Sequence, residues 1–219
     1  MSEHFPRTAL QLCSMVRADR TVELSLNEVE IPAPGANDVI IRVEAAPINP
    51  SDLGLLLAGA DITALAMTGT AGRPVVTAPL PDAAMRAARA RVGQPMPVGN
   101  EGAGTVVAAG SSPAASALLG KTVAAAGGGM YAEYRSVDAA FCLALPAGTS
   151  AVDGASAFIN PLTALGMIET MRLENHSALV HTAAASNLGQ MLNRLCLADG
   201  IPLVSIVRRY TSRSISMAR

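Results

Sequence analysis

Residues 179–209, LVHTAAASNLGQMLNRLCLADGIPLVSIVRR, predict a strand, a tight turn, a helix and a second strand. A short apolar run ends in a cluster of small residues, and Gly189 follows where helical periodicity begins. Apolar residues then recur on one helical face, and Gly200 stands where a helix usually ends. This order is typical of the first unit of a nucleotide-binding sheet.

The turn keeps only part of the dinucleotide fingerprint. Against G-x-G-x-x-G the chain offers Ala184-x-Ser186-x-x-Gly189, which retains the last glycine alone. Small side chains there still let the backbone approach a phosphate group closely. On the motif alone, an ordinary helix crossover without a ligand is about as compatible with this sequence as cofactor binding.

The end of the second strand favours one cofactor. No Asp or Glu stands there to accept from a ribose hydroxyl, and Arg208 and Arg209 stand there instead. A guanidinium suits a ribose phosphate, so NADP(H) is favoured over NAD(H). The alternative is that both arginines merely end a strand in solvent.

Composition excludes several classes of protein. The 219 residues are 50% hydrophobic and 3% aromatic, with a net charge of −1, which is typical of a globular protein and implies neither nucleic acid nor an anionic membrane surface as partner. The start lacks a signal-peptide pattern, and the apolar run 151–171 is interrupted by polar residues and Pro161. We therefore expect no membrane partner and a cytoplasmic location.

The cysteines and histidines show no metal-ligand spacing. Cys13, Cys142 and Cys196 are scattered in apolar contexts, and the chain has no C-x-x-C pair. They are most simply buried thiols of a reducing compartment.

Residues 1–150 predict a β-rich domain. Short alternating runs are separated by proline and glycine turns, as at residues 32–37. The loop 46–52, APINPSD, carries Asn49 and Asp52, and Asp52 is best interpreted as a cap of the following short helix. A helical connector, broken or kinked at Pro161, leads into residues 179–209, so we place a domain boundary near residue 150 and a second domain at 151–219.

Residues 60–97 have no strong pattern except for a small helix at 82–91. We interpret them as an excursion over the mouth of a cleft or as a surface loop.

The order of motifs resembles the medium-chain dehydrogenase/reductase superfamily. The segments are APINPSD at 46–52, GNEGAGTVVAAG at 99–110, INPLTALGM at 159–167, the Ala/Ser turn and the IVRR strand end. The zinc-independent branch is the most similar, namely the NADPH:quinone oxidoreductases and the 2-enoyl thioester reductases.

The resemblance implies a mixed α and β fold, in which a GroES-like β-domain precedes a Rossmann domain. It implies hydride transfer from NADPH to a small-molecule acceptor: a quinone, an enone or an enoyl thioester. Asn49 would lie near the substrate, and Asn160 and Thr163 near the nicotinamide. The remaining cofactor contacts would come from the pyrophosphate turn, Ala184, Ala185, Ser186, Asn187, Leu188 and Gly189, and from Arg208 and Arg209 at the ribose phosphate.

Two differences from relatives concern the chemistry. Zinc-dependent relatives have a cysteine in the loop matched here by Ile48-Asn49 and a histidine before the glutamate; here Asn100 precedes Glu101, so thiolate and imidazole ligands are missing. The enoyl reductases also carry a tyrosine after the N-P-S-D loop, which residues 55–65 lack. Tyr131, Tyr134 and Tyr210 lie in other motifs, so protonation would fall to water or another group.

The third difference is length. Relatives continue past the second strand with further strands and helices, whereas this sequence ends ten residues after Arg209. We therefore expect half a Rossmann domain. The alternative function is a truncated, catalytically silent fragment that acts at most as a binding or assembly module. Relatives often form homodimers through a sheet edge that this chain lacks, so a dimer is doubtful here.

Overall fold

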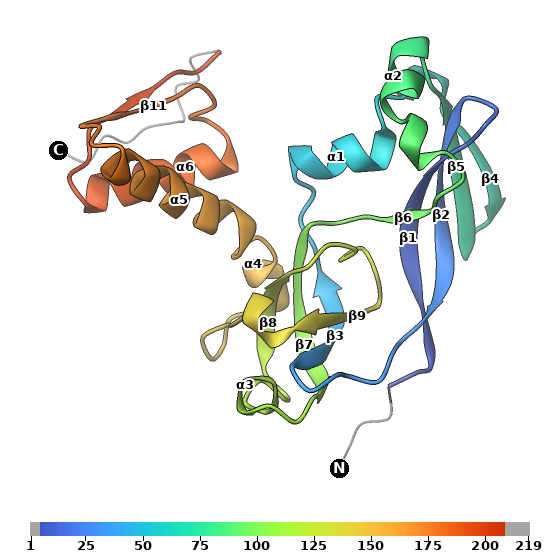
Figure 1. Cartoon of the computed structure of the whole chain (residues 1–219), viewed down its shortest axis with the longest axis horizontal. Coiled ribbons are helices and arrows are strands. Elements are labelled where there is room, and N and C mark those ends of the chain that lie inside the picture. Colours follow the sequence, from blue (N-terminus) through green and yellow to red (C-terminus); the bar gives the residue numbers. More distant parts are fainter. Residues whose placement is uncertain (1–4, 209–219) are drawn as a thin grey trace. The chain divides into compact units, whose positions relative to one another are not determined.

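The computed structural model describes residues 5–208, and the chain divides into two compact units between Ser156 and Ala157 (Figure 1). The mixed α and β class expected from the sequence is confirmed. Each unit is described below by itself.

The first unit consists mainly of two five-stranded sheets, in the orders β4-β5-β2-β1-β6 and β10-β8-β7-β3-β9. All pairings in both sheets are antiparallel. The strands are β1 (Thr8–Val16), β2 (Thr21–Glu30), β3 (Asp38–Ala45), β4 (Ala66–Thr70), β5 (Arg73–Pro79), β6 (Met96–Pro97), β7 (Glu101–Ala109), β8 (Thr122–Ala126), β9 (Tyr134–Asp138) and β10 (Cys142–Ala144). Its helices are α1 (Pro50–Leu57), α2 (Asp82–Ala87), α3 (Pro113–Ser116) and α4 (Ala151–Gly154), with short 3-10 turns η1 (Ile62–Ala64), η2 (Arg89–Arg91) and η3 (Ala139–Phe141).

Two apolar clusters hold these sheets. Val39 and Ile41 of β3 pack with Val106 and Val123 in the second sheet, and all four are almost fully buried. Alternate residues of a strand point to the same face, which explains the spacing of the first pair. The first sheet has its own cluster, in which Val16 and Val22 are joined by partners from the chain around β5.

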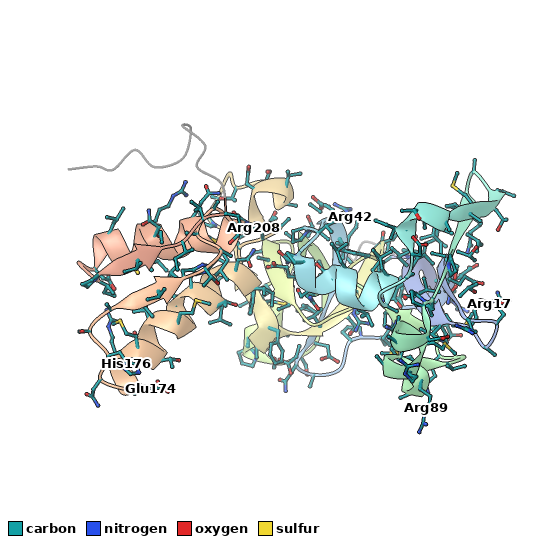
Figure 2. The ribbon with its side chains drawn as sticks, turned by 90° about the horizontal axis from the view of Figure 1, so that it is seen from above. Arg17, Arg42, Arg89, Glu174, His176 and Arg208 are labelled. Atoms are coloured by element: carbon teal, nitrogen blue, oxygen red, sulfur yellow. The ribbon has the colours of Figure 1, made fainter. Side chains whose placement is uncertain are left out.

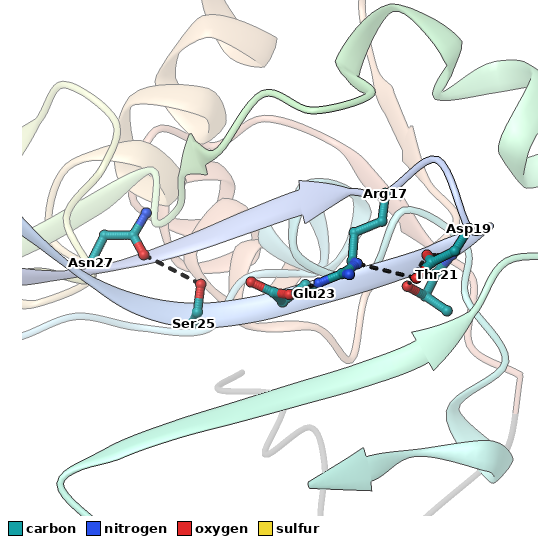
Figure 3. Close-up of polar contacts among 6 residues, drawn as sticks. All are labelled: Arg17, Asp19, Thr21, Glu23, Ser25 and Asn27. Atoms are coloured by element: carbon teal, nitrogen blue, oxygen red, sulfur yellow. Dashed lines mark hydrogen bonds and ion pairs between the residues drawn. The ribbon is translucent and has the colours of Figure 1, made fainter. Parts of the chain in front are cut away.

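The β1–β2 hairpin is bordered by a row of polar contacts at the surface (Figure 3). Arg17 lies 2.5 Å from Glu23, and the Thr21 hydroxyl donates to Asp19 over 2.7 Å. Arg20 adopts a left-handed φ of 66° at the turn. Exposed ion pairs of this kind add little to stability, so the hairpin depends mainly on its strand pairing and buried face.

Residues 60–97 are more regular than the sequence indicates. β5 pairs with β2, β4 pairs with β5, and the short β6 pairs with β1, so the segment adds three strands to the first sheet. Ala78 and Leu80 enter the core beside Val16. Local composition did not predict these strands because they are stabilised by an edge, that of β2, contributed by a distant part of the chain.

The second unit consists of α5 (Ile159–Leu173), β11 (Leu179–His181), α6 (Asn187–Ala198) and β12 (Leu203–Ser205). β11 and β12 are parallel, with Val180 opposite Val204. Ala164 and Ile168 of α5 pack against Leu192 and Cys196 of α6, and all four are nearly inaccessible to solvent. The helix therefore crosses between two parallel strands, as the sequence predicts.

The break in the connector differs from the expectation. The chain leaves helix at residues 155–158, and Pro161 lies inside the first turn of α5. Proline is tolerated there because the first amides of a helix have no acceptor within the helix.

The stretch Ala151–Leu173 is long and apolar enough to cross a membrane by length and composition, and 28% of it is buried. In the structure it comprises two helices, α4 and α5. Length and hydropathy alone do not distinguish a membrane segment from two successive helices with a break between them.

Candidate functional site

The turn between β11 and α6 is built around Ser186. Ser186 has extended backbone angles and its hydroxyl accepts from the Gly189 amide over 3.0 Å, which makes it the N-cap of α6. The Ser186 amide in turn donates to the Ala183 carbonyl over 2.9 Å. These bonds leave the first amides of α6, at Asn187 and Leu188, without a helical acceptor, at the positive end of the helix dipole.

Gly189 is the one fingerprint glycine that the chain retains, and the structure explains why. A Cβ atom on Gly189 would lie 2.6 Å from the carbonyl oxygens of both Ala183 and Ala184. Carbon and oxygen cannot approach so closely without displacing the backbone. Gly189 therefore allows the turn to pack directly on the first turn of α6.

A cavity of about 320 Å³ lies between this turn and the end of β12. Four predicted site residues line it: Ala184, Ala185, Ser186 and Arg208. The sequence analysis did not include the other lining residues, Thr182, Ala183, Ile206 and Val207, although their positions next to the predicted ones could have suggested them.

The other predicted turn residues lie in α6 itself. Asn187 begins the helix, Gly189 is buried, and Leu188 packs against the core between α5 and α6. None of the three lines the cavity. The Gly189 amide already donates to Ser186, so a ligand could meet only the amides of Asn187 and Leu188.

Arg208 is exposed and brings the only charged side chain among the described residues that line this cavity. No carboxylate stands in that lining to repel a phosphate. Arg209, the second predicted arginine, lies outside the described residues.

Thr163 lines a different cavity. Its hydroxyl donates to the Ile159 carbonyl over 2.7 Å, and it borders an open space of about 560 Å³ with Met167, Thr170 and His176. Figure 2 shows Arg208 and the Glu174–His176 pair on different sides of the second unit. Asn160 lies in the first turn of α5 and has interactions of its own. That Asn160 and Thr163 approach the nicotinamide remains a prediction.

Asn49 belongs to a buried polar network in the first unit. Its side-chain amide donates to Glu101 over 2.9 Å, and its backbone amide donates to Asp52 over 2.8 Å. The Asp52 carboxylate also accepts from the Asn100 amide over 2.9 Å. Asn49, Asp52 and Glu101 are only 8%, 2% and 1% exposed. Asp52 thus stabilises the start of α1, as expected, and also joins the loop 46–52 to the start of β7.

Tyr131 joins the same loop from another part of the chain. Its hydroxyl donates to the Pro47 carbonyl over 2.8 Å, and its ring lies where a side chain on Gly99 would otherwise be. Burial, together with the negative charge of Asp52, raises the pKa of Tyr131 to about 12, so the phenol stays protonated at neutral pH. The sequence assigns Tyr131 to a separate motif, and only the fold brings it close to Pro47 and Asp52.

The described residues, 5–208, contain no group of three His, Cys, Asp or Glu side chains arranged to hold a metal ion. Burial raises the pKa of Cys13 and Cys196, and burial together with Asp138 raises the pKa of Cys142 to about 12. Thiols held in the protonated form are poor nucleophiles and poor metal ligands.

Comparison with known proteins adds family evidence. Residues 35–147, about half of the chain, match the family model described as the alcohol dehydrogenase GroES-like domain. No curated protein sequence matches significantly.

Solved structures resemble both units. A protein from Mesorhizobium loti, provisionally assigned as an NADPH:quinone reductase, is 30% identical with a TM-score of 0.65, over 94% of this chain and 56% of that one. A quinone oxidoreductase from Coxiella burnetii is 18% identical with a TM-score of 0.62, over 90% and 56% of the two chains. A mycobacterial protein solved in complex with NADPH is 20% identical with a TM-score of 0.59, over 93% and 53%. The chain therefore spans a little over half the length of these structures.

Proposed function

Since the chain belongs to the medium-chain dehydrogenase/reductase superfamily and carries its alcohol dehydrogenase GroES-like domain, we propose that it takes part in NADPH-dependent hydride transfer to a small-molecule acceptor without zinc. The acceptor class is a quinone, an enone or an enoyl thioester. The relative from Mesorhizobium loti, whose description names an NADPH:quinone reductase, supports this choice of chemistry.

One observation carries the proposal: the small-residue turn and the arginine at the end of β12 border the same cavity. The amides at the start of α6 suit the pyrophosphate, because a helix N-terminus favours negative charge. Arg208 suits the ribose phosphate that distinguishes NADPH from NADH. Gly189 and Ser186 keep the turn in the shape that this binding needs.

The bound cofactor supplies the hydride, and the residues of this chain bind and orient the reactants. Asn160 and Thr163 would act at the nicotinamide end, by resemblance to relatives. Asn49 would act near the acceptor, with its amide oriented by the hydrogen bond to Glu101. Positioning of this kind is a large part of catalysis when the cofactor carries the chemistry.

The polar network supports a reaction without zinc. Asn49 and Asn100 stand where relatives that use zinc have ligands, and both amides are hydrogen-bonded, to Glu101 and to Ser51. Amide nitrogens do not bind zinc as thiolates and imidazoles do. We expect chelators to leave activity unchanged.

Calorimetric titration of the 219-residue chain tests the cofactor assignment. We expect saturable NADPH binding, at least about tenfold tighter than NADH, because charge-assisted hydrogen bonds contribute about 1.5–3 kcal/mol. Arg208→Ala should remove most of this preference, whereas Arg89→Ala, another exposed arginine outside the site, should not. Equal dissociation constants for NADPH and NADH in the unaltered chain would contradict the proposal.

The alternative is a silent binding or assembly module. Mixing the chain with NADPH and 1,4-benzoquinone, or with a short enoyl thioester, separates the two. Oxidation of NADPH above the uncatalysed rate supports the enzyme. Saturable binding without turnover supports the module.

A further inference from the structure

We propose that His181 is a positioning residue that fixes the first peptide of the phosphate turn through its Nδ1 atom; this inference rests on the proposed NADPH site. His181 is the last residue of β11 and is 9% exposed. Its Nδ1 atom accepts a hydrogen bond from the Ala183 amide over 2.9 Å. Neither the cavity lining nor the fingerprint includes this residue.

The bond determines the state of the imidazole. Nδ1 can accept from an amide only when it carries no proton, so the neutral ring holds its proton on Nε2. The backbone of His181 is fixed as well, since its carbonyl accepts from the Ile206 amide over 2.9 Å. The ring is therefore attached to a strand end that both parallel strands hold in place.

Residue Ala183 is held on both sides, because its amide and its carbonyl, which belong to adjacent peptide groups, are both hydrogen-bonded. His181 accepts from its amide, and its carbonyl accepts from the Ser186 amide over 2.9 Å. The same carbonyl oxygen would lie 2.6 Å from a Cβ on Gly189, which shows how closely this peptide packs on α6. A change in the backbone angles of Ala183 would thus move the Ser186 cap and the cavity wall together.

The bond from Ala183 to His181 also affects which amides of the turn can bind a ligand. It takes the Ala183 amide out of reach of a ligand, and the Ala184 amide donates to the Ile206 carbonyl over 3.4 Å. The Gly189 amide donates to Ser186. Among the described residues of the turn, the amides without such a bond are that of Ala185, which lines the cavity, and those at the start of α6. By holding the Ala183 amide, His181 leaves these amides to bind the anion.

Two substitutions separate positioning from mere packing. In His181→Asn the amide oxygen occupies the δ position, as Nδ1 does, and can accept from Ala183. In His181→Gln the oxygen lies one bond further from the backbone, as Nε2 does, and cannot replace that bond. Both replace the ring with an amide. His176→Asn and His176→Gln, at an exposed histidine of the same unit, serve as matched controls.

We expect His181→Gln to weaken NADPH binding roughly tenfold, about 1.4 kcal/mol, while His181→Asn stays within about twofold of the unaltered chain. Equal losses in both variants, or no loss in either, would overturn the inference. The His176 variants should match the unaltered chain.

A second measurement does not depend on NADPH. Hydrogen exchange should protect the Ala183 amide in the unaltered chain and in His181→Asn but not in His181→Gln, and the ¹⁵N shifts of His181 should show a proton on Nε2. If the unaltered chain binds no NADPH, the proposed function fails while the exchange data still decide what His181 does. Exchange of Ala183 that is equally fast in all three proteins would refute the role of His181.

Discussion

At the scale of single residues, the turn between β11 and α6 keeps the one fingerprint glycine that its backbone needs. Gly189 is retained because two carbonyl oxygens occupy the space of its missing side chain. Ala184 and Ser186 replace the other two glycines of the fingerprint, and both line the cavity. The fingerprint is thus reduced to the glycine for which no other residue can substitute without moving the backbone.

Gly189→Ala tests this reading. We expect a loss of about 1–3 kcal/mol in stability, because the new methyl group would overpack the turn, together with weaker NADPH binding. Gly166→Ala is the matched control: Gly166 lies in α5 with no neighbouring atom within 4 Å of a Cβ, so alanine should be neutral or stabilise the helix by up to about 1 kcal/mol. Thermal unfolding and calorimetry measure both effects, and similar results for the two variants would contradict the steric argument.

The raised pKa of Tyr131 predicts that the folded state loses stability at alkaline pH. Its folded-state pKa, raised to about 12 by burial and by Asp52, lies above the ordinary value of 10. The folded state therefore keeps a proton that the unfolded state loses, so stability is full below pH 10 and falls between about pH 10 and 12.

Tyr131→Phe should flatten this part of the pH dependence and, below it, cost about 1 kcal/mol for the lost bond to Pro47. Urea unfolding across the alkaline range measures both. Cys142 titrates in an overlapping range because its pKa is also raised to about 12, so Cys142→Ala is measured beside it. A phenylalanine variant with an unchanged alkaline slope would exclude Tyr131 as the cause.

At the scale of elements, the hydrophobic pattern predicted the helices and strands that pack against elements nearby in the sequence. The strand, turn, helix and strand of residues 179–209 were predicted in order because α6 presents one apolar face to α5. The second strand is short: the mostly apolar run continues from residue 201 to 207, whereas β12 covers only Leu203–Ser205. Among the described residues, β12 pairs only with the three residues of β11, so the residues on either side of it have no strand partner.

Elements stabilised by distant partners were missed. β4 and β5 formed because β2 offers an edge. A contact of Arg91 was not predicted either: its guanidinium donates to the Leu55 carbonyl over 3.0 Å at the end of α1. Burial lowers the pKa of Arg91, and no carboxylate pairs with it among the described residues. Its contact with the last carbonyls of α1 is consistent with a cation at a helix C-terminus.

At the scale of the whole molecule, two compact units predict a localised response to ligand. A ligand that binds only the folded second unit at one hundred times its dissociation constant should stabilise that unit by about 2.7 kcal/mol. Hydrogen exchange with and without NADPH should therefore show the largest protection in β11, α6 and β12. Protection confined to the first unit would contradict the assignment of the cofactor to the turn.

The sequence by itself determined the superfamily, the order of elements in residues 179–208 and the residues that form the turn before α6, because these depend on local periodicity, on small residues at a turn and on motifs in a fixed order. Only the tertiary structure decided which side chains meet. It placed Thr163 at a cavity other than that of the turn, and it joined Asn49 to Glu101. It also brought the Tyr131 hydroxyl to the Pro47 carbonyl and the His181 ring to the Ala183 amide. The first three relations involve packing or pairing between separate segments of the chain, and the fourth needs the backbone of the turn, so no local pattern encodes them.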